Sequence, residues 1–137
     1  MKTKTIVHTN AAPAAVGPYS QAVCVNAVQF ISGQLPLDPR SGQLVEGGIT
    51  EQTGQCLKNL GAILGEMGLG YENVVKTTVL LSDMGDFARM NEIYATCFGE
   101  NSPARACFQV AALPMGARVE IEAVSSRGYI LPEKEEE

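Results

Sequence analysis

The sequence predicts an α+β domain in which two helices cover one face of a mixed β-sheet. Two segments carry apolar residues at the spacing of a helix that buries one side. Shorter segments, rich in β-branched residues and bounded by turn-forming residues, are typical of strands. In chain order they read strand, strand, strand, helix, strand, helix, strand, strand, which is typical of an α+β domain. Because two helices cover one face only, a partner surface is expected to cover the other face.

The first half of the chain supplies three strands and the longer helix. The strands are expected at residues 3–8, 21–25 and 28–33. A tight turn is expected at 26–27, and segment 36–42 holds two prolines and a glycine, which predicts a loop. A helix is expected over 51–67, with Thr50 as its N-cap and Gly68 as the left-handed residue that ends it.

The second half supplies a central strand, the second helix and two further strands. Segment 74–81 is apolar and β-branched, as in a buried strand. Ser82 or Asp83 is the expected N-cap of the second helix, which ends at Gly99. The apolar stripe of this helix consists of Phe87, Met90, Tyr94 and Phe98. The strands that complete the sheet are residues 104–110 and 118–125.

Composition indicates one domain over residues 1–128, followed by a flexible acidic tail over 129–137. A chain of 137 residues with 45% hydrophobic and 18% charged residues is large enough for one packed core. The formal charge is −5, but residues 133–137 carry four acidic side chains and one basic one, which leaves −2 for the rest. A body of this charge, without a run of lysine or arginine, does not attract nucleic acids or anionic membranes.

Neither a membrane segment nor a metal site is expected. No apolar stretch approaches the roughly 20 residues of a transmembrane helix, and no signal peptide is recognised, so a cytoplasmic location is predicted. His8 is the single histidine, which excludes a multi-histidine metal site within one chain. The cysteines show no Cys-x-x-Cys spacing, so they are interpreted as reduced thiols. They are Cys24, Cys56, Cys97 and Cys107.

Arg105, Glu120 and Glu122 are the candidate functional residues that the residue pattern offers. In a strand over 118–125 the two glutamates share one face, roughly 7 Å apart, while the alternate residues fill the core. An exposed pair of like charges on a surface strand is the plain interpretation. The alternative is a small pocket, in which the guanidinium of Arg105 anchors a carboxylate ligand and a glutamate serves as acid and base.

Two other residues have both a structural and a functional interpretation. Asn91 lies on the apolar stripe of the second helix, where a buried amide needs hydrogen-bond partners. Either a bond to a loop or a role in a site meets that need. Tyr19 follows a Gly-Pro turn, where an aromatic ring with a hydroxyl group often lines a pocket.

Six motifs follow one another at characteristic distances: 14–23, 31–36, 73–79, 86–87 with Asn91, 103–105 and 119–123. Together they resemble the reactive intermediate deaminase family, and within it the RidA (YjgF-type) subgroup. The resemblance extends over about residues 4 to 127. Two positions differ from the family pattern, because Ala106 stands where a serine is frequent and Gln109 where a glutamate is common.

The resemblance implies a chorismate-mutase-like fold assembled as a homotrimer, with clefts between the subunits. The activity that it implies is hydrolysis of 2-imino acids, such as 2-iminopropanoate and 2-iminobutanoate, to 2-keto acids and ammonia. Enzymes that use pyridoxal phosphate release these imines. No cofactor or metal is implied for the hydrolysis itself.

The resemblance also implies a role for each candidate residue. Arg105 would clamp the substrate carboxylate, and Glu120 would activate a water molecule and protonate the departing amine. Five further residues match family positions around the cleft, with Cys107 offering its backbone and a thiol wall. They are Tyr19, Ser32, Gly33, Asn91 and Cys107.

Two other functions remain alternatives at this point. Some members of the family are described as endoribonucleases or translation inhibitors, and a non-catalytic sensor could bind keto acids in the same clefts. The acidic body and the lack of a histidine pair argue against a ribonuclease. A sensor would need Arg105 as much as an enzyme would.

Overall fold

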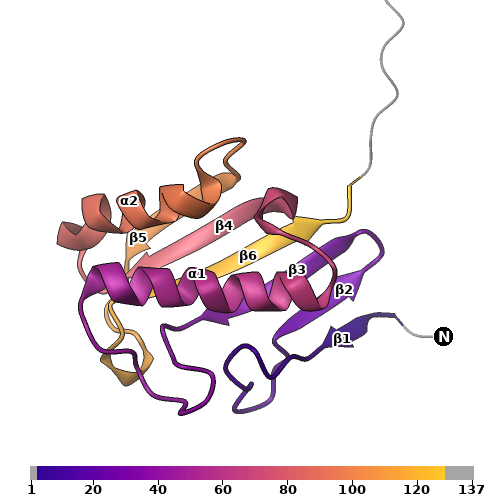
Figure 1. Ribbon diagram of the computed structural model, residues 1–137, viewed down its shortest axis with the longest axis horizontal. Helices are drawn as coiled ribbons and strands as arrows, with labels where there is room; N and C mark the ends of the chain where they lie inside the picture. The colour runs from indigo at the N-terminus through magenta and orange to yellow at the C-terminus, as the bar shows by residue number, and fades with distance from the viewer. Residues whose placement is uncertain (1–2, 129–137) are drawn as a thin grey trace, which may run out of the picture.

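Six strands form one sheet in the order β1-β2-β3-β6-β4-β5 in the computed structural model, which describes residues 3–128 (Figure 1). Every neighbouring pair is antiparallel except β4 and β5, so the sheet is mixed, as predicted. Helices α1 and α2 both lie on one face of it (Figure 1). The strands are β1 (Thr5–Val7), β2 (Ala22–Val25), β3 (Val28–Gln34), β4 (Val74–Leu81), β5 (Ala104–Gln109) and β6 (Val119–Ser126). The helices are α1 (Ile49–Glu66) and α2 (Phe87–Phe98).

Helix α1 begins earlier than the sequence predicts. Its first residue is Ile49, so Thr50 lies inside the helix and the prediction of Thr50 as N-cap is wrong. Gly48 precedes the helix, and its N–H donates to Oε2 of Glu51 at 2.8 Å. This bond satisfies one of the free amides at the helix start, because the glutamate side chain reaches back over the first turn.

The predicted end of α1 is confirmed. Gly68 adopts φ +72°, the left-handed conformation that glycine accepts most readily. Its N–H donates to the carbonyl of Gly65, and the N–H of Leu69 donates to the carbonyl of Leu64. These two bonds are those of a Schellman motif, which satisfies the last carbonyls of the helix.

Helix α2 begins at Phe87, and the prediction that Ser82 or Asp83 caps it is wrong. Asp83 instead accepts the N–H of Gly85 at 2.7 Å and starts a 3₁₀ turn over Met84–Asp86. That turn runs directly into α2, so the aspartate caps the turn rather than the helix. The acidic tail predicted over 129–137 lies outside the described residues.

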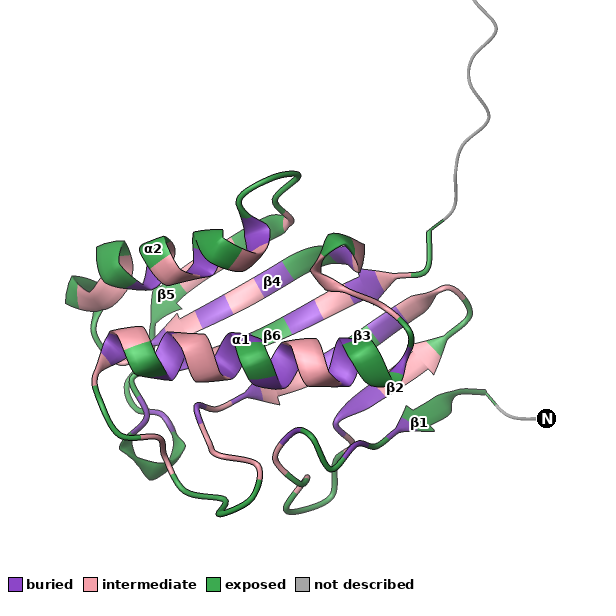
Figure 2. Ribbon diagram, viewed as in Figure 1, coloured by how far each residue is buried: buried purple, intermediate pink, exposed green. Residues whose placement is uncertain are grey.

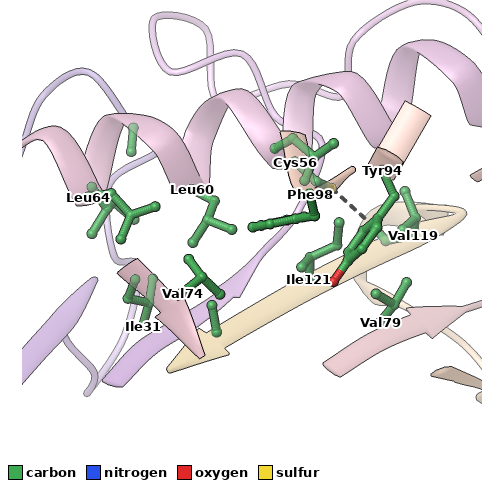
Figure 3. Close-up of a cluster of buried hydrophobic side chains, with 14 of the residues drawn as sticks. Ile31, Cys56, Leu60, Leu64, Val74, Val79, Tyr94, Phe98, Val119 and Ile121 are labelled. Atoms are coloured by element: carbon green, nitrogen blue, oxygen red, sulfur yellow. Dashed lines mark hydrogen bonds between the residues drawn. The ribbon is translucent and has the colours of Figure 1, made fainter. Parts of the chain in front are cut away.

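The core lies between the helices and the sheet. Buried residues alternate with more exposed ones along β4 and β6 (Figure 2), as expected for strands with one covered face. Leucines and Cys56 of α1 point toward the strands (Figure 3), and the thiol of Cys56 donates to the carbonyl of Val119 at 3.7 Å. The predicted interior residues of β6 are fully or nearly fully buried: Val119, Ile121 and Ala123.

Candidate functional site

Glu120 lies on the face of the sheet that the helices leave open. It pairs with Leu80 of β4, between Val119 and Ile121, whose side chains point into the core. Among the described residues, none forms a salt bridge with Glu120. A half-buried carboxylate without a salt-bridge partner within residues 3–128 is unusual for a purely structural residue.

A cavity of about 880 Å³ opens beside Glu120. Four predicted site residues line it: Tyr19, Ser32, Gly33 and Glu120. The remaining wall comes from segments around residues 13–16, 35–42 and 114–115, which are mostly apolar but include Arg40, and from Glu122. The cavity thus combines two carboxylates and one guanidinium with hydroxyl groups and apolar surface, and a few polar groups in an apolar wall are usual for a small-molecule site.

An irregularity in β3 brings the backbone close to Glu120. The pairing of β3 with β6 is shifted between Ile31 and Gln34. Within this interval, the hydroxyl of Ser32 donates to the carbonyl of Ser20 at 2.6 Å. A Cβ atom built on Gly33 would lie 2.9 Å from Cδ and Oε1 of Glu120. Such a bulge is a common way of aiming groups at a site, and here only glycine leaves room for the carboxylate.

The protonation of Glu120 is shifted by its surroundings. Burial raises the pKa of this carboxyl above its ordinary value, and the negative charge of Glu122 raises it further. Both effects disfavour the charged form. A carboxyl with a raised pKa both accepts and returns a proton near neutral pH more readily than an ordinary glutamate does.

Tyr19 belongs to a turn at the rim of this cavity. Gly17 has φ +123°, and its carbonyl accepts the N–H of Tyr19 at 2.9 Å. The hydroxyl of Tyr19 accepts the N–H of Val16 at 3.4 Å. The ring is 53% exposed, so it is free to contact a ligand or a neighbouring chain.

Arg105 lies on the edge strand β5, on the other face of the sheet. It pairs with Thr77 of β4, whose hydroxyl shares a hydrogen bond of 2.7 Å with the hydroxyl of Tyr94 in α2. Arg105 therefore points toward the helices, and it is exposed because no strand lies beyond β5. A second cavity, of about 450 Å³, lies beside it, with Asn91 on its wall.

Asn91 forms a hydrogen bond with Arg105, so of its two interpretations, a bond to a loop or a role in a site, the structure favours the second. Its Oδ1 accepts a hydrogen bond from Nη1 of Arg105 at 2.7 Å. The guanidinium carbon also lies 4.8 Å from the ring centroid of Tyr94 and 5.5 Å from that of Phe87. No bond from the Asn91 side chain to a loop is found within residues 3–128. The guanidinium of Arg105 thus contacts three residues of α2, which are Phe87, Asn91 and Tyr94.

Cys107 lies two residues beyond Arg105 on the same face of β5. Burial raises the pKa of its thiol, while Arg105 acts in the opposite direction with a smaller effect. The thiol is therefore mostly protonated at neutral pH, and a protonated thiol is a poor nucleophile. This state fits the predicted role of a wall better than that of a nucleophile.

The candidate residues thus form two groups on opposite faces of the sheet. One group surrounds Glu120, and the other surrounds Arg105. The register fixes this division, because Arg105 pairs with buried Thr77, whereas Glu120 pairs with Leu80 on the open face. Alternate residues of a strand point to opposite faces. A substrate of a few atoms cannot contact both groups of one chain.

The pattern analysis of the sequence did not identify Phe87 and Tyr94 as site residues. Both were assigned to the apolar stripe of the second helix. Their spacing around Asn91 carried a signal, since residues at i, i+4 and i+7 share one helix face. An asparagine between two aromatic residues on such a face is suited to hold an arginine.

Residues 3–128 contain no cluster of three or more histidine, cysteine or acidic side chains that could bind a metal ion. The helices of this region are also too short or too polar to cross a membrane.

Comparison with known proteins places the chain among close relatives. The family described as endoribonuclease L-PSP matches residues 9–126. The 2-iminobutanoate/2-iminopropanoate deaminase of Mus musculus is 59% identical over 125 residues, which cover 91% of this chain and 93% of the mouse chain. The human protein of the same name is 56% identical, with 91% of each chain covered.

Solved structures agree with this placement. RidA from the Antarctic bacterium Psychrobacter sp. is 46% identical, with a TM-score of 0.85, and the match covers 89% of this chain and 98% of the other. TdcF of E. coli, solved with bound serine, is 38% identical with a TM-score of 0.86, covering 90% of this chain and 99% of the other.

Proposed function

The chain belongs to the endoribonuclease L-PSP family, and we propose that it hydrolyses 2-imino acids to 2-keto acids and ammonia. The observation that carries this proposal is the 59% identity to the mouse 2-iminobutanoate/2-iminopropanoate deaminase, which extends over nearly the full length of both chains. The resemblance to reactive intermediate deaminases seen in the sequence is confirmed by these relatives. The ribonuclease and the non-catalytic sensor are not favoured.

Glu120 and Arg105 divide the reaction between them in this proposal. Arg105 binds the substrate carboxylate through N–H donors that Asn91 does not occupy, which fixes the position of the imine carbon. Glu120 accepts a proton from water as the water oxygen attacks that carbon. It then returns this proton to the nitrogen, which gives a carbinolamine. As the C=O bond of the keto acid forms and the C–N bond breaks, Glu120 takes the proton of the carbinolamine hydroxyl and passes it to the nitrogen, which leaves as ammonia.

The active site is shared between two chains of a homotrimer in this proposal. Two observations support it: Arg105 and Glu120 lie on opposite faces of the sheet, and both are accessible. The open sheet face also exposes Phe30 to 52%, although such surface is normally covered. The Arg105 group of one chain then meets the Glu120 group of the next, as in a closed cyclic assembly. The family resemblance implies this trimer together with a chorismate-mutase-like fold of each chain.

The function is tested with 2-iminobutanoate generated in situ by a threonine dehydratase. The chain should accelerate formation of 2-ketobutyrate, and Glu120→Gln should lower the rate by about 10²- to 10⁴-fold. No acceleration over the spontaneous reaction would refute the function. RNA cleavage that copurifies with the chain and disappears in Glu120→Gln would support the ribonuclease instead.

The shared site is tested by mixing two inactive variants, Arg105→Ala and Glu120→Gln. The two variants are mixed in equal amounts, unfolded and refolded together. Each shared site then receives an intact Arg105 in about half of the cases and, independently, an intact Glu120 in about half, so about one quarter of the sites should be complete. If each site lies within one chain, the mixture stays inactive. A solution mass near three chains should accompany the recovery.

The cytoplasmic location expected from the sequence stays a prediction.

A further inference from the structure

Arg105 is held by aromatic rings as well as by a hydrogen bond. The guanidinium carbon lies over the ring of Tyr94 at 4.8 Å and over that of Phe87 at 5.5 Å. Both distances are within the range of a cation–π interaction. Asn91 binds Nη1 at 2.7 Å, so the arginine has one bonded nitrogen and two ring contacts.

The Tyr94 ring is itself restrained by a hydrogen bond at its hydroxyl and by contact with a second ring. Its hydroxyl is bonded to the fully buried hydroxyl of Thr77 at 2.7 Å. Its ring packs against Phe98 with the centroids 4.7 Å apart, and only 6% of the residue is exposed. A ring restrained at its hydroxyl and by packing offers the guanidinium a defined surface, whereas an exposed arginine on an edge strand would otherwise sample many rotamers.

We propose that Tyr94, through its ring, which packs against Phe98, and assisted by Phe87, is a positioning residue that presents Arg105 to the substrate carboxylate. This inference rests on the proposed function. The two rings fix the guanidinium, Asn91 occupies one of its N–H groups, and the remaining N–H groups stay available for an anion. Pre-orientation of this kind lowers the conformational entropy that substrate binding would otherwise cost.

The role of Tyr94 is in its ring, and this gives the proposal a distinctive signature. Tyr94→Phe retains the ring and should retain pyruvate binding within about threefold, although the bond to Thr77 is lost. Tyr94→Leu removes the ring and should weaken pyruvate binding by about 3- to 30-fold, the range that corresponds to one cation–π contact. A residue that merely fills the core would show no such preference for an aromatic ring.

The chain offers a matched control in Tyr71. It is partly buried, whereas Tyr94 is buried, and its hydroxyl likewise bonds to a partner in a buried residue, the carbonyl of Leu57 at 2.6 Å. Its ring meets that of Phe98 edge to face, with the centroids 5.5 Å apart, and forms no cation–π contact with Arg105. Tyr71→Leu is therefore the same substitution in the same core, and it should lower the melting temperature while leaving pyruvate binding unchanged.

The experiment compares wild type, Tyr94→Phe, Tyr94→Leu, Phe87→Leu and Tyr71→Leu. Pyruvate affinity is measured by calorimetry, KM and kcat with imine generated in situ, and stability by thermal unfolding. Tyr94→Leu and Phe87→Leu should raise the pyruvate Kd and KM together and change kcat less, because they weaken an interaction that ground state and transition state share.

The outcomes separate a failure of the proposed function from a failure of the positioning role of Tyr94. If wild type does not accelerate imine hydrolysis, the proposed function fails, whereas active wild type with unchanged pyruvate binding in Tyr94→Leu overturns the positioning role. Equal losses in Tyr94→Leu and Tyr71→Leu overturn it as well. Phe87 is only half-buried, so Phe87→Leu should fold even if Tyr94→Leu does not. A pyruvate Kd raised at least threefold in Phe87→Leu supports the positioning of Arg105 by aromatic rings, and an unchanged Kd refutes it.

Discussion

Replacing Gly33 by alanine should impair catalysis without harming the fold. A Cβ atom at this position would lie 2.9 Å from Cδ and Oε1 of Glu120, whereas ordinary contacts begin at 3.4 Å. The carboxylate must therefore move by about 0.5 Å, or rotate out of its place. A displacement of about 1 Å in a catalytic group can cost about 10²-fold in rate, so a loss of about 10- to 100-fold in kcat/KM is expected.

The fold should tolerate this change because the atom that yields is the end of a flexible side chain. The φ of Gly33 lies outside the left-handed region, so alanine fits the backbone. Alanine also reduces the freedom of the unfolded chain, which adds about 0.4 to 1 kcal/mol of stability where no strain arises. The melting temperature should accordingly stay the same or rise slightly while the activity falls.

Gly54 provides the matched control for Gly33. It lies in α1, and a Cβ atom there would meet nothing within 4 Å. Imine hydrolysis is followed as keto acid formation in both variants, beside thermal unfolding. Gly54→Ala should keep full activity. Full activity in Gly33→Ala as well would refute the reasoning, because it would mean that the position of the Glu120 carboxylate does not govern the rate.

Three further predictions concern charge and buried hydrogen bonds. Arg105→Lys should lose the planar fork and lower kcat/KM more than tenfold with unchanged thermal unfolding; equal activity would exclude bidentate binding. Glu122→Gln removes one cause of the raised pKa of Glu120, so the acidic limb of the pH profile of kcat/KM should move to lower pH, and an unmoved limb would exclude that coupling. Asn59 donates to the carbonyls of Leu35 and Leu37, so Asn59→Ala should lower the free energy of unfolding in urea by about 2 to 4 kcal/mol, and a loss below about 1 kcal/mol would contradict the structural role of both bonds.

The raised pKa of Glu120 also sets the sign of a stability effect. A carboxyl whose pKa is higher in the folded chain than in the unfolded chain keeps its proton up to a higher pH in the folded state. Its stabilising contribution is complete below the unfolded pKa and is lost as pH rises through the folded pKa. For the single chain, in which no neighbouring Arg105 lowers this pKa, Glu120→Gln should thus be more stable than wild type at neutral pH and no more stable in acid. This pattern is typical of a residue kept for function at the expense of stability.

Apolar periodicity was sufficient to predict the order of the elements and the buried stripe of α2. Of the four predicted stripe residues, Met90, Tyr94 and Phe98 are buried and Phe87 is half-buried. The helix starts were less predictable, since several residues with capping side chains lie near each start. Glu51 and Asp83 decided the outcome through bonds to Gly48 and Gly85, and such local bonds depend on loop conformations that periodicity does not describe.

Sequence patterns identified Arg105 and Glu120 as candidates but could not place them relative to one another. Alternation within a strand tells which residues share a face of that strand. It does not tell which strands are neighbours, nor how they are aligned. The register of β5 and β6 against β4 supplies that information, and it sends the two side chains to opposite faces. The role of Asn91 was open for the same reason, because its partner lies on a strand 14 residues further along the chain.

The division into two groups has a physical consequence for how the chain must work. Within residues 3–128 neither Glu120 nor Arg105 forms a salt bridge, so each group lacks a directly paired opposite charge in the single chain. The arginine lies on an edge strand, held by Tyr94 and Asn91, and the glutamate lies on an uncovered sheet face. An edge of one chain that meets the open face of another would bring a fixed cation to a carboxylate whose pKa is raised by burial. The cation would lower that pKa again, so the pKa of Glu120 in the assembly should lie below its value in an isolated chain. Comparing the acidic limb of the pH profile between wild type and the weakly held Phe87→Leu variant tests this, because a less well placed guanidinium should leave the limb at higher pH.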